Sequence, residues 1–154
     1  NMPASENYRQ IIDLGCGNGL LGLVAALVNP EAVLSFVDES YMAVDSAKIN
    51  FKRAFSDDRE AEFKLSICLE GFKNENADLV IINPPFHQQH HVGDAVAWQM
   101  FSDARRVLRN DGEVVVVGNR HLAYHAKLKK IFGNCQQLAS NKKFTVLQAV
   151  KKQN

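Results

Sequence analysis

The stretch Asp13-Leu14-Gly15-Cys16-Gly17-Asn18-Gly19 decides how this chain folds. Residues 9–14 (Arg-Gln-Ile-Ile-Asp-Leu) lead into it, and residues 20–28 after it carry apolar side chains at helical spacing. Glycines at alternate positions allow the backbone to turn tightly and to lie directly against a ligand. The stretch therefore predicts a strand, a ligand-binding turn and a helix. Close packing of the helix on the strand would also explain such glycines.

Strands and helices alternate through the rest of the chain. We expect strands at 32–37, 63–69, 77–82, 113–117, 136–139 and 144–150, helices at 42–51, 94–108 and 121–131, and loops at 55–62, 87–93 and 110–112. Asn141 joins the last two strands in a hairpin. This order predicts an α/β fold, a doubly wound and mostly parallel sheet with helices on both faces and one antiparallel strand. Ligands bind such sheets at the carboxyl ends of the strands, where 15–19, 38–39 and 83–86 fall.

The composition fits a single globular domain spanning 1–154. The 154 residues are 46% hydrophobic, enough for a central sheet covered on both faces, so we expect no second domain within them. No apolar run approaches the roughly 20 residues that cross a bilayer, and 1–7 do not resemble a secretion signal. Cys16, Cys68 and Cys135 are far apart, which favours reduced thiols. We therefore expect a cytoplasmic protein without a membrane partner.

The net charge of +1 conceals two oppositely charged parts of the chain. Residues 1–100 hold 7 Lys and Arg against 14 Asp and Glu, whereas 101–154 hold 11 against 3. A basic surface favours nucleic acid, because each neutralised phosphate releases counterions. A solvated basic surface without a partner is the other interpretation, and charge alone does not separate the two.

Two carboxylates accompany the glycine-rich turn. Its pattern, D-x-G-x-G-x-G, differs from the G-x-G-x-x-G that binds a dinucleotide pyrophosphate, and Asp13 at its front suits a ligand with an ammonium group, which it can hold directly or through water. Asp38 stands 19 residues beyond Gly19, at the end of the second expected strand. A carboxylate there can accept hydrogen bonds from both hydroxyls of a ribose. The two acids together predict a sugar-bearing cofactor.

Asn83-Pro84-Pro85-Phe86 follows directly on the apolar strand expected at 77–82. The prolines stiffen the turn and remove two donors, which leaves the Asn83 side-chain oxygen and the Pro84 carbonyl as acceptors. Two acceptors that hold the N–H groups of an exocyclic base amine aim its lone pair at an electrophile. Phe86 offers a ring on which an extruded base can stack. A Pro-Pro strand terminator with Phe86 in the core is the alternative.

The glycine-rich turn and the two acids resemble the S-adenosylmethionine site of Rossmann-like methyltransferases. The resemblance implies a seven-stranded sheet with an antiparallel seventh strand, and S-adenosyl-L-methionine as cofactor. It also implies that Glu39 borders the adenine and that a polar residue after the third strand meets the adenine amino group. No Asp or Asn stands near Ile67, so Ser66 or a backbone group would take that place. The implied cofactor residues are Asp13, Gly15, Cys16, Gly17, Asn18, Gly19, Asp38, Glu39, Ser66 and Asn83.

The four residues Asn83, Pro84, Pro85 and Phe86 resemble the catalytic motif of enzymes that methylate amino groups of nucleic-acid bases. Glutamine methylators carry a related motif that usually ends in Tyr. The resemblance implies a catalytic role for all four residues, and Phe86 in the last position favours a base as substrate.

A closer resemblance covers nearly the whole chain. The segments that carry it are 83–90, 97–101, 104–106, 119–122, 127–135 and 141–144. They are similar to the bacterial ribosomal RNA large subunit methyltransferase G family. That family implies methylation of the exocyclic N2 of a guanine in 23S ribosomal RNA, with RNA contacts here from Phe86, His87, Arg120 and His121. It also implies a further N-terminal domain that recruits RNA, so we expect this chain to be the C-terminal part of a longer protein.

The histidines offer a metal site as an alternative to RNA contacts. His87, His90 and His91 lie close together in sequence, and His121 and His125 lie four residues apart. No carboxylate or cysteine has the matching spacing, so we predict no metal.

Other functions compete with base methylation. The glycine-rich turn and Asp38 also occur in nicotinamide-dependent oxidoreductases, although the glycine spacing differs. A catalytically silent RNA-binding module and a methyltransferase that acts on adenine N6 or a glutamine amide are further alternatives. Trp98 and Phe101 are expected to pack in the core and to have no chemical role.

Overall fold

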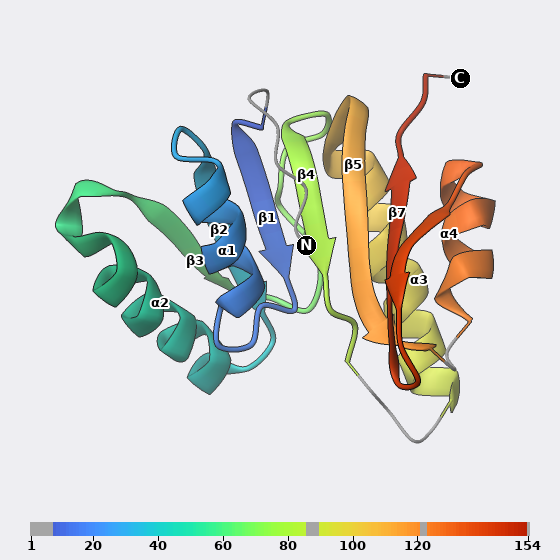
Figure 1. Ribbon diagram of the computed structural model, residues 1–154, viewed down its shortest axis with the longest axis horizontal. Coiled ribbons are helices and arrows are strands. Elements are labelled where there is room, and N and C mark those ends of the chain that lie inside the picture. The colour runs from blue at the N-terminus through green and yellow to red at the C-terminus, as the bar shows by residue number, and fades with distance from the viewer. Residues whose placement is uncertain (1–7, 86–89, 121–122, 154) are drawn as a thin grey trace.

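The computed structural model describes residues 8–85, 90–120 and 123–153, which form one seven-stranded sheet flanked by helices (Figure 1). The sheet has the strand order β3-β2-β1-β4-β5-β7-β6. Its strands are β1 (Gln10–Leu14), β2 (Val33–Asp38), β3 (Ala61–Leu65), β4 (Ala77–Ile82), β5 (Leu108–Asn119), β6 (Gln136–Ser140) and β7 (Phe144–Val150). The helices are α1 (Leu20–Val28), α2 (Tyr41–Phe55), α3 (His90–Val107), α4 (Tyr124–Phe132) and the short 3-10 helix η1 (Ser56–Asp58). Pairing is parallel except where β7 meets β5 and β6, which confirms the expected Rossmann-like α/β fold.

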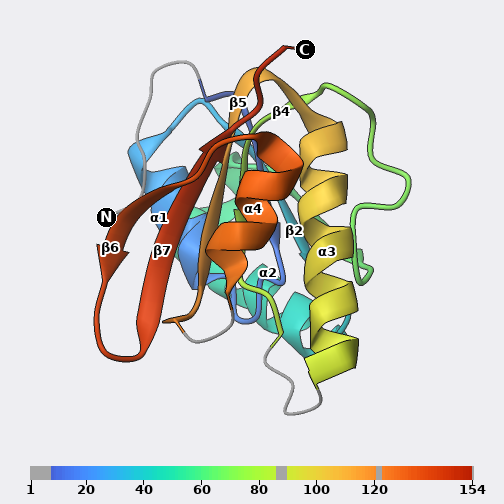
Figure 2. The same cartoon turned by 90° about the vertical axis from the view of Figure 1, so that its right-hand side faces the viewer.

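Helices cover both faces of the sheet (Figures 1 and 2). On the face of α1 and α2, the buried rings of Phe36 and Phe51 meet edge to face, with centroids 5.6 Å apart. On the face of α3 and α4, Phe101 is fully buried, as expected. Trp98 of α3 is only half-buried and not in the core as expected, and the Lys130 Nζ of α4 lies 5.8 Å from its ring centroid. Every residue of the central strand β4 is buried, which explains its apolar sequence.

The chain reverses its direction across the sheet between β1 and β4. From β1 it proceeds to β2 and β3 on one side, and it then returns to β4 on the other side. Leu14 at the end of β1 pairs with Val37 of β2 and with Ile82 of β4, so the three strands end at nearly the same level. Loops diverge at such a reversal and leave a crevice for a ligand. The fold therefore brings the loops after β1, β2 and β4 to one edge, at the bottom of Figure 1.

Two strand boundaries differ from expectation. The third strand spans Ala61–Leu65, not 63–69. Beyond it, the Ser66 N–H still donates to the Asp38 carbonyl at 2.8 Å, and the chain then leaves the sheet. The expected loop at 55–62 accordingly contains η1 and the start of β3. The turn expected at 110–112 is an irregularity within β5, where the register with β4 shifts between Ala77 and Leu79. Both strand starts lack the alternation of apolar residues that would have located them.

Helix starts differ as well. Helix α3 begins at His90, four residues before the expected start, and α4 begins at Tyr124 instead of 121. Sequence signals locate helix ends within only a few residues. The core and the strand order do not depend on these boundaries.

No helix within the described ranges is long and apolar enough to cross a membrane. All three cysteines are free, and Cys16 and Cys68 are buried. Burial raises the pKa of the Cys68 thiol to about 11. A thiol that stays protonated at neutral pH is a poor nucleophile.

Candidate active site

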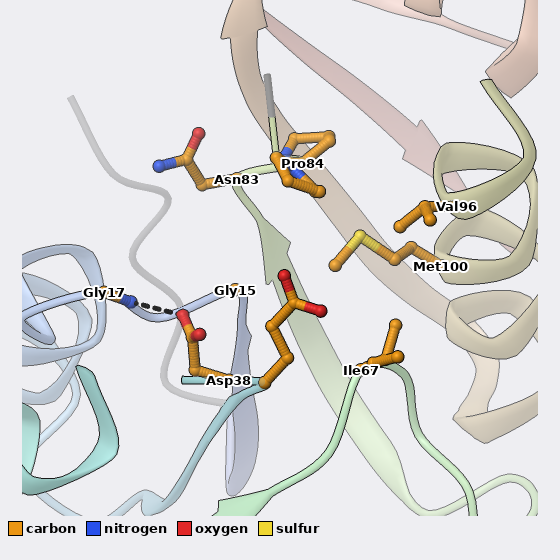
Figure 3. Close-up of a pocket in the computed structure, with 10 residues that line it drawn as sticks. Gly15, Gly17, Asp38, Ile67, Asn83, Pro84, Val96 and Met100 are labelled. Atoms are coloured by element: carbon orange, nitrogen blue, oxygen red, sulfur yellow. Dashed lines mark hydrogen bonds between the residues drawn. The ribbon is translucent and has the colours of Figure 1, made fainter. Parts of the chain in front are cut away.

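A pocket of about 510 Å³ opens at the carboxyl ends of β1, β2 and β4 (Figure 3). Its walls come from the loops after these strands, from the loop after β3 and from α3. The lining residues are Gly15, Gly17, Asp38, Glu39, Ile67, Asn83, Pro84, Pro85, Val96 and Met100. The structure therefore brings together seven residues that were expected at the site, from three segments far apart in sequence.

Gly15 and Gly17 form the floor of the pocket, and the absence of a side chain has a different consequence at each position. The N–H groups of Gly15 and Cys16 both donate to the Val37 carbonyl, at 2.8 and 3.0 Å, which ties the turn to β2. A Cβ at Gly15 would lie 2.6 Å from the carbonyl oxygen of Asn83, so only glycine fits where the two loops cross. Gly17 has φ +54°, and no atom lies within 4 Å of the position of a Cβ there. The turn thus presents bare backbone to the pocket at Gly17.

Three other residues of the glycine-rich turn do not line the pocket. Cys16 is buried, and the pKa of its thiol is raised to about 12 because burial penalises the thiolate. The Asn18 side-chain oxygen accepts the Leu20 N–H at 3.1 Å at the start of α1. A Cβ at Gly19 would lie 3.0 Å from Ala47 of α2, so the last glycine of the turn serves helix packing. Their roles as cofactor contacts stay predictions.

Asp38 holds the turn and the start of α2 with one carboxylate. Its Oδ2 accepts the Gly17 N–H and its Oδ1 accepts the Ser40 N–H, both at 2.9 Å (the Gly17 contact is dashed in Figure 3). Each carboxylate oxygen has two lone pairs, so each can accept one more hydrogen bond. The side chain is half-buried at the edge of the pocket. Asp38 is thus fixed in place at the edge of the pocket and keeps free acceptor capacity.

Asp13 lies behind the turn and does not line the pocket. It is fully buried, its Oδ2 accepts the Gly22 N–H at 2.9 Å, and its Oδ1 has no hydrogen-bond partner among the described residues. Burial raises the pKa of Asp13 to about 7, and the nearby charge of Asp38 acts in the same direction, whereas the Gly22 N–H opposes it. An unpaired buried carboxylate oxygen is costly unless a donor reaches it.

Asn83 and Pro84 stand at the end of β4, directly above Gly15. The Asn83 N–H donates to the Leu14 carbonyl at 3.2 Å, which fixes the turn to β1. Pro84 is buried, while Asn83 is exposed and its side chain points away from Met100 (Figure 3). This arrangement leaves the Asn83 side chain accessible from outside the protein. Phe86 and His87 of the same motif, like His121, lie outside the described residues.

Sequence reasoning missed three apolar pocket residues and one structural glycine. Val96 and Met100 come from α3, and their spacing of four residues indicated only a helix face. Ile67 lines the pocket itself, whereas the half-buried Ser66 does not. Gly22 was not singled out, yet a Cβ there would lie 2.8 Å from the Asp13 Oδ2. No single-residue signal could have indicated these contacts, because each depends on a distant segment.

Arg120, the remaining expected site residue within the described part of the chain, does not line the pocket. Arg120 is exposed just beyond β5, and its N–H donates to the Lys143 carbonyl at 3.0 Å. Within the described part of the chain, no three His, Cys, Asp or Glu side chains gather in a way that could hold a metal ion.

Comparison with known proteins identifies the family. The model of a family described as "Methyltransferase small domain" matches residues 1–148. This chain belongs to that family. The small domain is 50% identical over 153 residues to "Ribosomal RNA large subunit methyltransferase G" of Vibrio vulnificus (strain YJ016), covering 98% of this chain and 41% of the relative. A protein of the same name from Serratia proteamaculans (strain 568) is 54% identical over 142 residues, covering 92% and 38%.

This chain spans about 40% of the length of these relatives. Among solved structures, the T. thermophilus 16S rRNA N2 G1207 methyltransferase (RsmC), in complex with AdoMet and guanosine, matches it with a TM-score of 0.79 and 30% identity. The match covers 96% of this chain and 39% of that chain. Protein Atu636 of Agrobacterium tumefaciens, described as a predicted O-methyltransferase, matches with a TM-score of 0.74 and 18% identity, covering 97% and 77%. This second likeness shows the fold alone.

The raised pKa of Asp13 predicts a pH-dependent stability of the small domain. The folded state retains this proton up to about pH 7, whereas the unfolded chain loses it near the ordinary pKa of an aspartate, 3.8. The folded state binds more protons between these values, so the free energy of unfolding falls as pH rises from about 4 to 7 and then levels. Asp13→Asn keeps the acceptor for Gly22 and should flatten this fall by an amount on the order of a few kcal/mol.

Urea denaturation at a series of pH values measures this dependence. Asp45→Asn, at an exposed carboxylate of α2, is the matched control and should keep the wild-type profile. An Asp13→Asn profile as steep as that of the wild type would contradict a protonated Asp13.

Proposed function

We propose that this domain transfers a methyl group from S-adenosylmethionine to the exocyclic N2 of a guanine in 23S ribosomal RNA. The observation that carries the proposal is the single pocket in which the glycine-rich turn, Asp38 and the Asn83-Pro84 turn meet. The names of the relatives and the guanosine and AdoMet of the T. thermophilus complex support the choice of cofactor and base.

The pocket fits S-adenosylmethionine by its donor and acceptor groups. Asp38 would accept hydrogen bonds from the two ribose hydroxyls with the lone pairs that Gly17 and Ser40 leave free. The Oδ1 of the buried Asp13, which has no partner among the described residues, would accept a bond from the ammonium group through a water, because Asp13 does not line the pocket. The positive charge of the ammonium group would favour the deprotonated form of Asp13 when the cofactor is bound. Ile67 supplies an apolar wall for the adenine beside Glu39. When bound, the cofactor supplies an electrophilic methyl group on its sulfonium.

The chain's own residues would position the nucleophile. The Asn83 side-chain oxygen and the Pro84 carbonyl accept the two N–H groups of the guanine amine, which otherwise delocalises its lone pair into the ring. Two fixed acceptors orient that lone pair and stabilise the positive charge that develops on nitrogen. Phe86 stacks on the base, and His87, Arg120 and His121 contact the RNA near it. The guanine nitrogen needs no general base while it takes the methyl group and the bond from that methyl to the sulfonium sulfur breaks. The methylated nitrogen then loses one of its two protons to water.

Ribosomal RNA as the substrate would place the protein in the cytoplasm. The relatives are more than twice as long as this chain, so we also propose that the chain is the C-terminal catalytic domain of a longer protein. The part outside this chain would help to recruit the RNA. A resident metal ion has no role in this proposal.

Calorimetric titration tests the cofactor assignment. We expect the domain to bind S-adenosylmethionine and not a nicotinamide dinucleotide. Asp38→Ala should weaken the affinity by about 30-fold or more, because two ribose hydroxyls lose a charged acceptor and the turn loses its tie to Gly17. Asp45→Ala, at an exposed acid on α2, should leave the affinity unchanged.

The titration also separates the competing functions. Binding of the nicotinamide dinucleotide alone would favour an oxidoreductase, and binding of neither compound would favour a silent RNA-binding module. An unchanged affinity in Asp38→Ala would contradict the ribose contact. Assays with guanine-free RNA and with a glutamine peptide then distinguish guanine from adenine and amide substrates.

A further inference from the structure

The tip of the β6–β7 hairpin, residues 140–144, lies at the same edge of the sheet as the pocket (Figures 1 and 2). Phe144 at the start of β7 pairs with Asn119 at the end of β5, and β5 is the direct neighbour of β4. Adjacent strands lie about 5 Å apart, so the hairpin tip is on the order of 10 Å to the side of the Asn83 turn. A strand of nucleic acid that delivers a base to the pocket would extend over such a distance within one or two nucleotides.

The hairpin tip carries unopposed positive charge. Residues 114–154 contain eight Lys and Arg and no Asp or Glu. Lys142 and Lys143 are exposed, and neither forms an ion pair within the described part of the chain. Arg120 is exposed beside them. An anion that approaches this edge therefore meets three cations and no competing carboxylate on the hairpin.

The hairpin tip is held in one conformation by its own hydrogen bonds. The Asn141 side-chain oxygen accepts the N–H groups of Lys143 and Phe144, at 2.8 and 2.7 Å, and the Asn141 N–H donates to the Phe144 carbonyl at 2.9 Å. Arg120 donates its N–H to the Lys143 carbonyl at 3.0 Å and its Nη1 to the Asn141 carbonyl at 3.2 Å. A surface that is already ordered loses little conformational entropy when it binds.

Phe144 adds an aromatic surface to these cations. The side chain is 47% exposed, although a ring at the start of a strand could have packed inward. The Lys143 Nζ lies 5.8 Å from its ring centroid. An exposed ring beside lysines is the combination that binds single-stranded nucleic acid, because the ring stacks on a base while the cations contact phosphates. A solvated basic loop would explain the lysines but not the exposed ring.

We propose that the hairpin tip is a docking site for single-stranded RNA next to the nucleotide whose base enters the pocket. Phe144 stacks on a flanking base, and Lys142 and Lys143 contact the phosphates on either side of it. The assignment of RNA rests on the proposed function, and the location rests on the hairpin itself. The contact is independent of base sequence, so it positions the strand and leaves the choice of guanine to the pocket.

Fluorescence anisotropy with a labelled single-stranded RNA of about 15 nucleotides tests the docking site. The variant Lys142→Gln/Lys143→Gln should weaken RNA binding by about tenfold at low salt. It should also reduce the slope of log affinity against log salt by about 1.4, since each phosphate contact on a single strand contributes about 0.7. Phe144→Leu should weaken binding with an unchanged slope, because it removes stacking and no charge.

A charge-matched control is available at the opposite edge of the sheet. Lys73 and Lys152 are exposed and precede β4 and follow β7, respectively. Lys73→Gln/Lys152→Gln removes the same charge and should bind RNA like the wild type. Equal losses of RNA affinity in both double variants would show a general electrostatic attraction and would overturn the docking site. Wild-type RNA affinity in Lys142→Gln/Lys143→Gln, or no RNA binding by the wild type, would overturn it as well.

Cofactor titration separates this proposal from the proposed function. All of these variants should bind S-adenosylmethionine like the wild type, because none of the changed residues lines the pocket. A failure of the proposed function would appear as absent cofactor binding in the wild type, whatever the hairpin variants do with RNA.

Discussion

Asn83→Ala should lower the rate of methyl transfer to RNA by about 100-fold or more, with a much smaller loss of affinity for S-adenosylmethionine. The variant removes one of the two acceptors that orient the guanine amine, and the loss of one preorganised polar contact to a developing charge has an effect of this size. The Asn83 backbone keeps its bond to the Leu14 carbonyl, so the turn should persist. Single-turnover methyl transfer with a saturating cofactor measures the chemical step, and calorimetry measures binding.

Asn110→Ala provides the control for this variant, because Asn110 is an exposed asparagine at the opposite edge of the sheet. It should transfer methyl groups at the wild-type rate. Full activity of Asn83→Ala, with cofactor bound, would refute the role of the asparagine in catalysis. An equal loss of cofactor affinity and of rate would assign Asn83 to the cofactor site instead.

The fold class and the position of the pocket were accessible from sequence because strong local signals agree with the global fold. The apolar run of β4 predicted a buried central strand, and the loops after β1, β2 and β4 carried the residues that now line the pocket. The alternation of strands and helices then allowed few arrangements of the sheet. Asp38 is a clear example, since its distance from Gly19 and its place after an apolar strand were both local features.

The features that sequence did not reveal depend on contacts between distant segments. The β3 strand is an edge strand with little burial, so its apolar pattern was weak and its boundaries were wrong. Asp13 was expected to hold an ammonium group directly or through water, but no sequence signal indicated that its side chain is fully buried, with one oxygen that has no hydrogen-bond partner among the described residues. The wall formed by Val96 and Met100 required knowledge of how α3 packs beside the pocket. In each of these cases the amino-acid type alone did not indicate the role of the residue, because that role depends on how distant segments pack.

Gly15→Ala and Gly17→Ala should differ sharply, although both change one glycine of the same turn. Both glycines have positive φ, at 72° and 54°, so an alanine at either costs roughly 1 kcal/mol of backbone strain. At Gly15 the added methyl would also lie 2.6 Å from the carbonyl oxygen of Asn83, which is a backbone atom that cannot rotate away. We expect a loss of about 2–4 kcal/mol in the free energy of unfolding for Gly15→Ala and about 1 kcal/mol for Gly17→Ala.

The functional consequences of the two changes should separate in the same way. Relief of the Gly15 clash requires the Asn83 backbone to move, and a displacement of a few tenths of an ångström to 1 Å at a positioning residue costs up to about 100-fold in rate. Gly15→Ala should therefore lose both cofactor binding and methyl transfer, even at temperatures where it stays folded. In Gly17→Ala the added methyl group enters open space at the pocket floor. This variant should therefore weaken the binding of the cofactor without a further loss in the rate of methyl transfer. Denaturant unfolding measures the stability, calorimetry the cofactor affinity and single-turnover transfer the rate of the chemical step. Equal behaviour of the two variants would show that the Gly15–Asn83 contact does not couple the cofactor turn to the catalytic turn.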